Sequence, residues 1–181
     1  MIWTLRVVSA LIAIAVFGVA GLFLVARFSD GPLAIVAGGP FSTGETVREE
    51  ISDWSFVHDL REVEFQLLDP ARSRTTWIVE HEGRAYIPSG YMTSWWGRLW
   101  KHWPYEAERD GRILLRIDGR IHPSRLRRVE SGPRLAPVLA ELSRKYAGGA
   151  AIPVEAVESG SLWIFEVAPR SGGAADLDPE E

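Results

Sequence analysis

The longest apolar run of the chain lies near its start. Residues 7–26 carry no charge and are almost wholly apolar, and Arg6 and Arg27 stand on either side of them. A helix of this length crosses about 30 Å of hydrocarbon. The alternative is a cleaved signal peptide, whose apolar region is usually shorter, at about 7–15 residues. The pattern therefore predicts an uncleaved single-pass membrane anchor. The positive-inside rule favours, by a small margin, an extracytoplasmic position for the rest of the chain.

Beyond residue 60, alternation of apolar and polar positions predicts strands. Val63, Phe65 and Leu67 alternate with polar neighbours, which is the two-residue period of a half-buried strand. Residues 75–79 are β-branched and aromatic, and we expect them to pair with residues 85–87 as a hairpin. A second hairpin is expected at residues 112–129 because Asp118-Gly119 is a strong turn signal. A last strand is expected at residues 161–168.

Two segments have the spacing of amphipathic helices. Aromatic and apolar residues between 91 and 103 recur at steps of three, four and one, so they share one helical face. These residues are Tyr91, Met92, Trp95, Trp96, Leu99, Trp100 and Trp103. Residues 133–146 form the second predicted helix, with Pro133 in its first turn and Gly148-Gly149 after its end.

These elements predict an α+β fold. About six antiparallel strands and two or three helices favour a small barrel, here preceded by one transmembrane helix. The expected division is a membrane anchor at 1–27, a tether and irregular lead-in at 28–60, a barrel domain at 61–170 and a disordered acidic tail at 171–181.

Charge is distributed unevenly. Residues 72–128 hold twelve basic and six acidic side chains, a surplus of six, whereas the chain as a whole has a net charge of −4. A basic segment in an acidic protein indicates an anionic ligand or surface. Removing the two arginines beside the apolar run leaves the remainder at −6, which argues against nucleic acid as a partner. The chain has no cysteine, so thiolate chemistry and iron–sulfur clusters are excluded.

Several segments within residues 65–170 resemble the flavin-binding split barrels, that is, the pyridoxamine-phosphate-oxidase-like and deazaflavin-dependent nitroreductase-like proteins. The segments are residues 72–79, the turn at Gly83, the basic stretch around Lys101, residues 110–119 and the closing residues 163–170. The resemblance implies a split β-barrel that binds FMN, with deazaflavin or haem as alternatives. It also implies a homodimer and hydride transfer by the flavin. No catalytic residue is named by it.

The resemblance also implies where the cofactor would bind. Basic and hydroxyl side chains of the strand at 72–79 and of the later basic stretch would hold the cofactor phosphate. The candidate cofactor-binding residues are Arg72, Arg74, Thr75, Thr76, Trp77, Arg98 and Lys101.

Each of these features has a plainer interpretation. Arginines and threonines are common on an exposed edge strand, where charge discourages aggregation. The tryptophan-rich face of the first predicted helix is typical of core packing. On a membrane-anchored chain it also suits a non-catalytic module that engages lipid or a membrane partner. Glu80-His81-Glu82 holds metal-capable side chains, but adjacent strand residues point to opposite faces and would converge only if the turn brought them together, so a solvated turn is expected. No metal site and no catalytic triad are expected.

Overall fold

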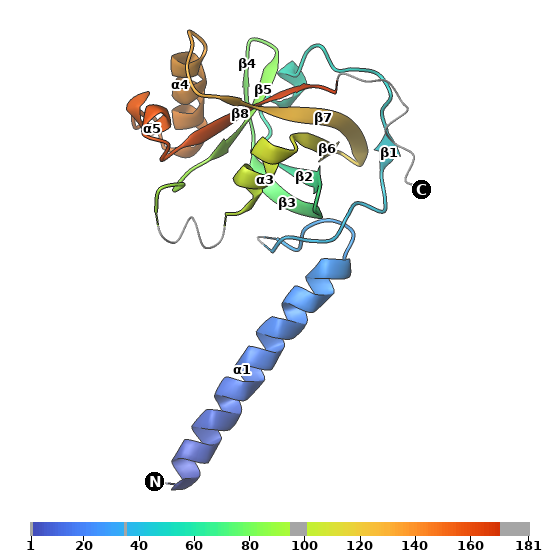
Figure 1. Cartoon of the computed structure of the whole chain (residues 1–181), viewed down its shortest axis with the longest axis vertical. Helices are drawn as coiled ribbons and strands as arrows, with labels where there is room; N and C mark the ends of the chain where they lie inside the picture. Colours follow the sequence, from blue (N-terminus) through green and yellow to red (C-terminus); the bar gives the residue numbers. More distant parts are fainter. Residues whose placement is uncertain (1, 35, 95–100, 171–181) are drawn as a thin grey trace.

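The computed structural model describes residues 2–34, 36–94 and 101–170 (Figure 1). A long N-terminal helix projects from one end of a body made of strands and short helices (Figure 1). The helix, α1, spans Ile2–Phe28, and its only buried residue is Ala26.

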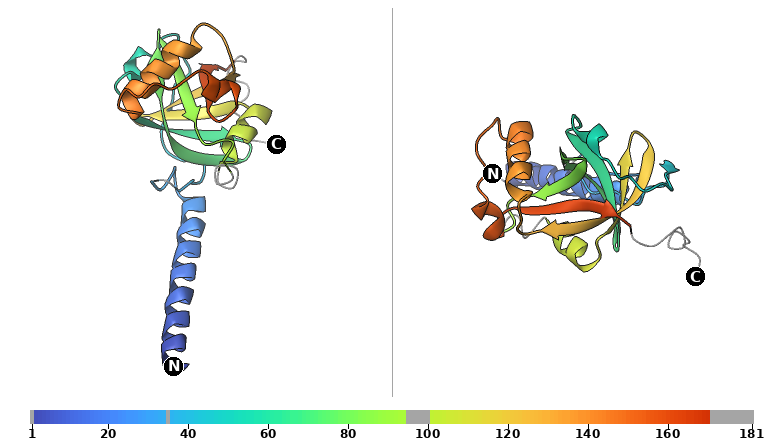
Figure 2. Two further views of the ribbon diagram at one scale, coloured as in Figure 1. Left: turned by 90° about the vertical axis from the view of Figure 1, so that its left-hand side faces the viewer. Right: turned by 90° about the horizontal axis from the view of Figure 1, so that it is seen from above.

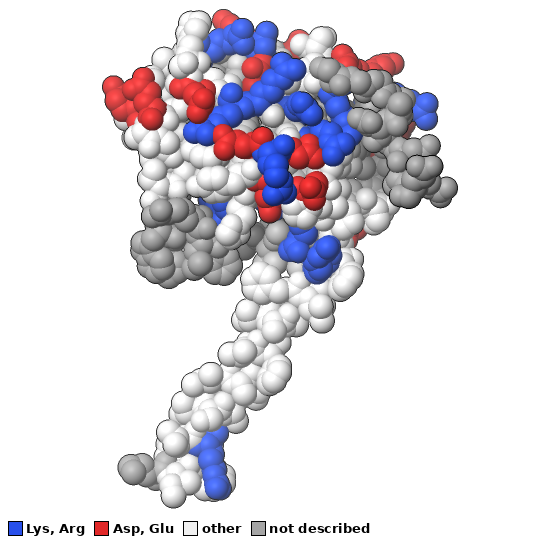
Figure 3. All heavy atoms as spheres, in the orientation of Figure 1, with Lys and Arg blue, Asp and Glu red and all other residues white. Residues whose placement is uncertain are grey.

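By length and composition α1 can cross a membrane. Its most apolar window has a mean hydropathy of 2.7, and none of that window is buried against the rest of the chain. Figure 3 shows the helix without charge between the basic side chains at its two ends, in contrast to the charged surface of the body. Its apolar side chains therefore face outwards on every side, as lipid would require.

The body contains eight short strands, a 3-10 turn and three further helices among the described residues. The elements in chain order are β1 (Glu45–Thr46), η1 (Ser55–Val57), β2 (Glu62–Leu68), β3 (Ala71–Trp77), β4 (Val79–His81), β5 (Arg84–Ser89), α3 (Trp103–Arg109), β6 (Arg112–Ile117), β7 (Arg120–Val129), α4 (Leu135–Tyr146), α5 (Glu155–Glu158) and β8 (Trp163–Pro169).

The strands make one sheet in the order β3-β2-β6-β7-β8-β5-β4, and β1 adds to β7 in parallel. All the other strand pairs are antiparallel. The sheet is curved, so that its first strand, β3, also contacts β5, the last strand but one in the order. The predicted α+β half-barrel with a long apolar helix before it is confirmed.

Apolar side chains gather on both sides of the sheet. The main cluster lies between strands β2, β5, β6 and β8, the turn η1 and helix α3, with Phe65, Leu115 and Phe165 fully or almost fully buried. A second cluster packs α4 and α5 against β4, β5 and β8, through residues such as Leu139 and Ile164. Figure 2 shows α4 and α5 together on one side of the strands.

The segment between α1 and β1 is held on the body. Asp30 forms an ion pair with Arg116 at 3.0 Å, and the Phe41 ring lies 4.1 Å under the same guanidinium. Gly38 exchanges two backbone hydrogen bonds with Ser73 of β3. A Cβ at Gly38 would lie 1.8 Å from the Gly31 carbonyl oxygen, so only glycine permits this close approach.

Two predictions about local structure need correction. Residues 75–77 belong to β3 and pair with β2, so the hairpin at Gly83 begins only with β4. The described residues 91–94 form a turn, not the start of a helix, and α3 begins at Trp103, with Pro104 in its first turn. The middle of the predicted aromatic helix, residues 95–100, lies outside the described residues. Trp103 itself is a core residue, with its ring 5.1 Å from that of Phe65.

Candidate cofactor site at strand β3

Strand β3 presents three of the predicted residues on the inner side of the sheet. Arg72, Arg74 and Thr76 pair with Leu67, Phe65 and Val63 of β2, all of which belong to the main apolar cluster. Directly opposite residues of an antiparallel pair share a face. The three polar side chains therefore stand at the rim of the barrel interior, on an edge strand of the sheet.

Arg74 is a largely buried cation that is only partly compensated. Its side chain is 17% exposed, its guanidinium lies 5.7 Å from the Phe65 ring, and Glu106 of α3 is 4.0 Å away. The Nε atom is buried, and no described residue accepts a hydrogen bond from it. Burial lowers the pKa of Arg74 to about 10; Glu106 opposes this shift, and the neighbouring positive charge of Arg72 adds to it.

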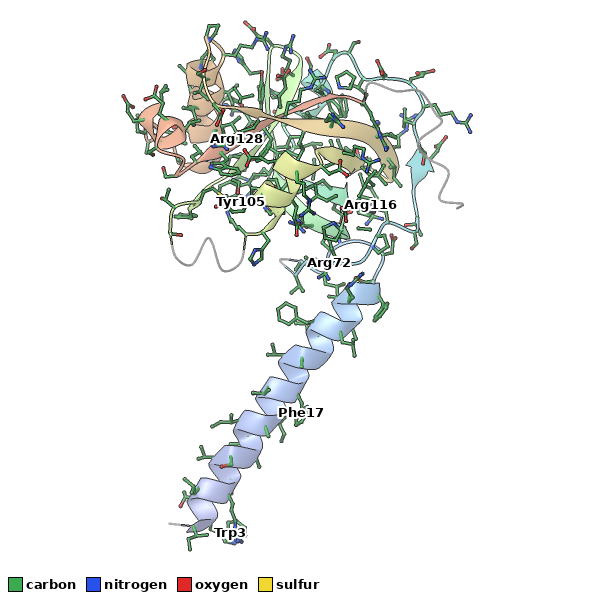
Figure 4. All side chains as sticks on the ribbon, in the orientation of Figure 1. Trp3, Phe17, Arg72, Tyr105, Arg116 and Arg128 are labelled. Carbon is green, nitrogen blue, oxygen red and sulfur yellow. The ribbon has the colours of Figure 1, made fainter. Side chains whose placement is uncertain are left out.

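Arg72 lies where the body meets the N-terminal helix. Figure 4 shows it at the end of the body from which α1 projects. Its Nη2 makes a long contact of 3.5 Å with the Ala37 carbonyl oxygen. Its Nε, like that of Arg74, is buried without an acceptor among the described residues. Two neighbouring guanidinium groups with unused donors form an arrangement that an oxyanion would stabilise.

Thr75 and Trp77 lie on the other face of β3. The Thr75 hydroxyl is exposed and donates to the Ala34 carbonyl at 3.3 Å. The Trp77 ring stacks on Tyr146 of α4, with centroids 4.5 Å apart and planes 9° from parallel. The structure therefore does not bring these two residues together with Arg72 and Arg74.

Lys101 is directed to the backbone at the end of β5. Its Nζ donates to the Gly90 carbonyl oxygen at 3.0 Å, and burial lowers the pKa of this ammonium. It also lies 5.8 Å from the centroid of the exposed Tyr91 ring. Arg98 lies outside the described residues.

Glu106 belongs to this arrangement, although the sequence did not mark it as a site residue. Its place in the first turn of a helix that begins at Trp103, with Pro104 also in that turn, was the only local sign of its position. The site therefore consists of two inward arginines, one inward threonine hydroxyl and one carboxylate that balances part of the charge. Its donors suit an oxyanion, and the fully buried Phe65 ring beside them packs against Trp103 and the Arg74 guanidinium.

Comparisons with known proteins give the following. No protein-family model matches the sequence, and no curated protein matches it significantly. Several solved structures are similar, including the following two. A conserved hypothetical protein from Mycobacterium tuberculosis shares 14% identity, over 64% of this chain and 77% of that one, with a TM-score of 0.43. A Listeria innocua protein, named provisionally as a pyridoxamine 5'-phosphate oxidase, shares 12% identity. The match covers 65% of this chain and 90% of that one, with a TM-score of 0.45. Likeness at this identity does not define a ligand.

Proposed function

We propose that the protein is a membrane-anchored flavin-binding split barrel, with the phosphate of FMN held by Arg72 and Arg74. The observation that supports it most is the pair of inward guanidinium groups whose buried Nε atoms have no acceptor among the described residues. The resemblance of residues 65–170 to flavin-binding split barrels is the reason for proposing that this anion is the phosphate of FMN.

The residues present fit a phosphate monoester. Arginine offers planar pairs of donors to phosphate oxygens, and a threonine hydroxyl donates to a further oxygen. Thr76 stands on the same face of β3 as both arginines, whereas Thr75 does not. When bound, the flavin would supply hydride chemistry. Arg72, Arg74 and Thr76 would hold the phosphate, and the charge of Arg74 would be balanced by the phosphate and Glu106 together.

The remaining parts of the proposal concern assembly and location. We propose that α1 remains as a single-pass anchor, with the barrel outside the cytoplasm, and that two barrels associate as a homodimer. The full exposure of the apolar window of α1 supports the anchor. Flotation with liposomes, protease access from each side of sealed vesicles, and light scattering in detergent test these three statements.

The binding test compares FMN with riboflavin, which lacks the phosphate. The detergent-solubilised full chain should bind FMN at least about tenfold more tightly than riboflavin, the effect of one lost charge-assisted contact. In Arg72→Gln and Arg74→Gln that preference should disappear. Thr75→Val, on the opposite face, is the matched control and should keep it. Equal affinity of the unmodified chain for FMN and riboflavin, or no flavin binding at all, would refute the proposal. A haem or deazaflavin spectrum would replace FMN by that cofactor.

A second candidate function is a non-catalytic module that engages lipid or a membrane partner. One exposed aromatic residue favours it: the Tyr91 side chain is 76% exposed and adjoins Lys101, a combination suited to the headgroup region. Flotation of residues 29–181 with anionic liposomes, and its loss in a Trp96→Ala, Trp100→Ala double variant, would support this module in place of the flavoprotein.

A further inference from the structure

A cavity of about 470 Å³ lies on the other side of the sheet, where α4 begins. Residues of β5, β7 and β8 and of the loop before α4 line it. Its apolar wall includes Leu135, Val138 and Ile164, which belong to the second apolar cluster. Arg74 instead contacts the main cluster, so the two sites are separate. The volume is within the usual range for a small-molecule site.

The cavity contains a buried hydroxyl that lacks a well-aligned hydrogen bond. Tyr86 of β5 is 1% exposed and pairs across the sheet with Glu166 of β8, which also lines the cavity. Its hydroxyl has no well-aligned hydrogen bond among the described residues, and the Arg134 side chain lies close enough to interact with it. Burial raises the pKa of Tyr86, and the nearby carboxylate of Glu166 raises it further, so the hydroxyl keeps its proton. An unpaired buried donor is unfavourable, and a ligand acceptor would satisfy it.

The charges around the cavity leave one cation uncompensated. Glu166 is paired with Arg84 at 2.5 Å. Arg128 forms ion pairs with Glu108 and Glu130. Arg134, on the exposed rim, has no ion pair within the described ranges. Its side chain lowers the pKa of Tyr86 in part, through a hydrogen-bonding contact with the hydroxyl and through its positive charge.

The start of α4 adds to this positive potential. The helix has twelve residues, no side-chain cap and no acidic residue in its first turn. The partial positive charge of a helix N-terminus is then not neutralised by the chain itself. Three features therefore favour a negative group at the same place: the hydroxyl of Tyr86, the charge of Arg134 and the end of α4.

We propose that this cavity binds a small organic carboxylate with an apolar body. The carboxylate accepts hydrogen bonds from the Tyr86 hydroxyl and the Arg134 guanidinium. The apolar body packs on Leu135, Val138 and Ile164. A bare inorganic anion would leave that apolar wall in contact with water, and a cation would meet Arg134. The site does not depend on flavin binding.

The test uses the full chain in nanodiscs and isothermal titration with benzoate and 2-naphthoate. We expect saturable binding of at least one of them, tighter than that of acetate, which lacks the apolar body, and of benzyl alcohol, which lacks the charge. Tyr86→Phe and Arg134→Gln should each weaken binding about tenfold, the effect of one lost charge-assisted hydrogen bond. Tyr91→Phe and Arg120→Gln are the matched controls, because neither residue lines the cavity.

A folding defect is separated from a binding defect by thermal unfolding. Because the Tyr86 hydroxyl has no well-aligned hydrogen bond in the free protein, Tyr86→Phe should change the unfolding midpoint little. No saturable binding of either aromatic carboxylate would overturn the proposal. So would equal binding by the unmodified chain and both cavity variants, or binding of inorganic phosphate in preference to benzoate. FMN affinity measured on the same samples reports on the flavin proposal independently.

Discussion

Buried cations of this protein are held by backbone carbonyl groups as well as by carboxylates. Lys145 of α4 is 8% exposed, and its Nζ donates to the carbonyl oxygens of His58, Leu60 and Ile78 at 2.8, 2.6 and 2.9 Å. The Tyr146 hydroxyl also donates, at 2.7 Å, to the carbonyl of Ile78. These contacts join the end of α4 to the segment after η1 and to the short stretch between β3 and β4.

Replacing Lys145 by methionine should destabilise the body strongly. The apolar part of the side chain is kept, but three carbonyl oxygens lose an ionic donor. Hydrogen bonds to charged groups contribute about 1.5–3 kcal/mol each, and water would satisfy some of the exposed carbonyls. We therefore expect a loss of about 3 kcal/mol in unfolding free energy, measured by urea denaturation. Arg144→Met, one residue earlier and exposed, is the control and should change stability by less than about 1 kcal/mol.

At the scale of elements, the segment between α1 and β1 depends on an ionised carboxylate. Burial alone raises the pKa of Asp30. This effect is outweighed by hydrogen bonds from the Thr43 side chain and from the backbone of Ser42 and Thr43, and by the charge of Arg116. The pKa of Asp30 therefore lies well below 3.8. A carboxyl whose folded-state pKa is depressed stabilises the fold above its unfolded-state pKa. That contribution is lost as the pH falls from 3.8 towards the folded-state value.

The acid sensitivity of the fold should therefore decrease in Asp30→Asn. The unmodified body should lose thermal stability as the pH is lowered through 3.8, in part because Asp30 takes up a proton. The Asp30→Asn variant should be less stable than the unmodified chain at neutral pH. Its thermal stability should fall less than that of the unmodified chain when the pH is lowered. Asp118→Asn, in the exposed β6–β7 turn, is the control. Melting curves between neutral pH and pH 2.5 measure both effects, and parallel losses in Asp30→Asn and the unmodified chain would contradict the assignment.

The strands were predictable where local periodicity determines them, and their pairing was harder to predict. Val63, Phe65 and Leu67 alternate as expected of β2, and Asp118-Gly119 does form the β6–β7 turn. The β2–β3 turn at Asp69-Pro70 carries a weaker signal than Glu82-Gly83, so residues 75–77 were assigned to the wrong hairpin. The inward direction of Arg72 and Arg74, and the exclusion of Thr75 and Trp77, follow from that register and could not be predicted before it. The pairing of Arg74 with Glu106 depends on tertiary packing and had no separate signal.

For the whole molecule, the body has a core of its own, to which helix α1 contributes no residue. Ala26 is the only buried residue of α1, and neither apolar cluster includes a residue of the helix. The segment that binds Arg116 and Ser73 begins only after Phe28. A body with its own core is expected to fold alone.

Removing residues 1–28 should therefore leave a folded protein. We expect the unfolding midpoint of residues 29–181 to lie within about 5 °C of that of the full chain, less than the effect of losing one core contact. The near-ultraviolet circular dichroism should be the same. The full chain should float with neutral liposomes and the truncated chain should not. Aggregation of the truncated chain, or loss of its tertiary signal, would contradict this division.

The backbone pairing of Gly38 with Ser73 has a consequence for proteolysis. Strand β3 is an edge strand of the sheet. The backbone hydrogen bonds between Gly38 and Ser73 occupy part of its otherwise unpaired edge. A protease that cuts just after Phe28 would release the body with this border still protected. A cut a dozen residues later would release it with an open strand, which is a template for association with other chains. The position of cleavage would thus determine whether the shed protein stays dispersed or precipitates.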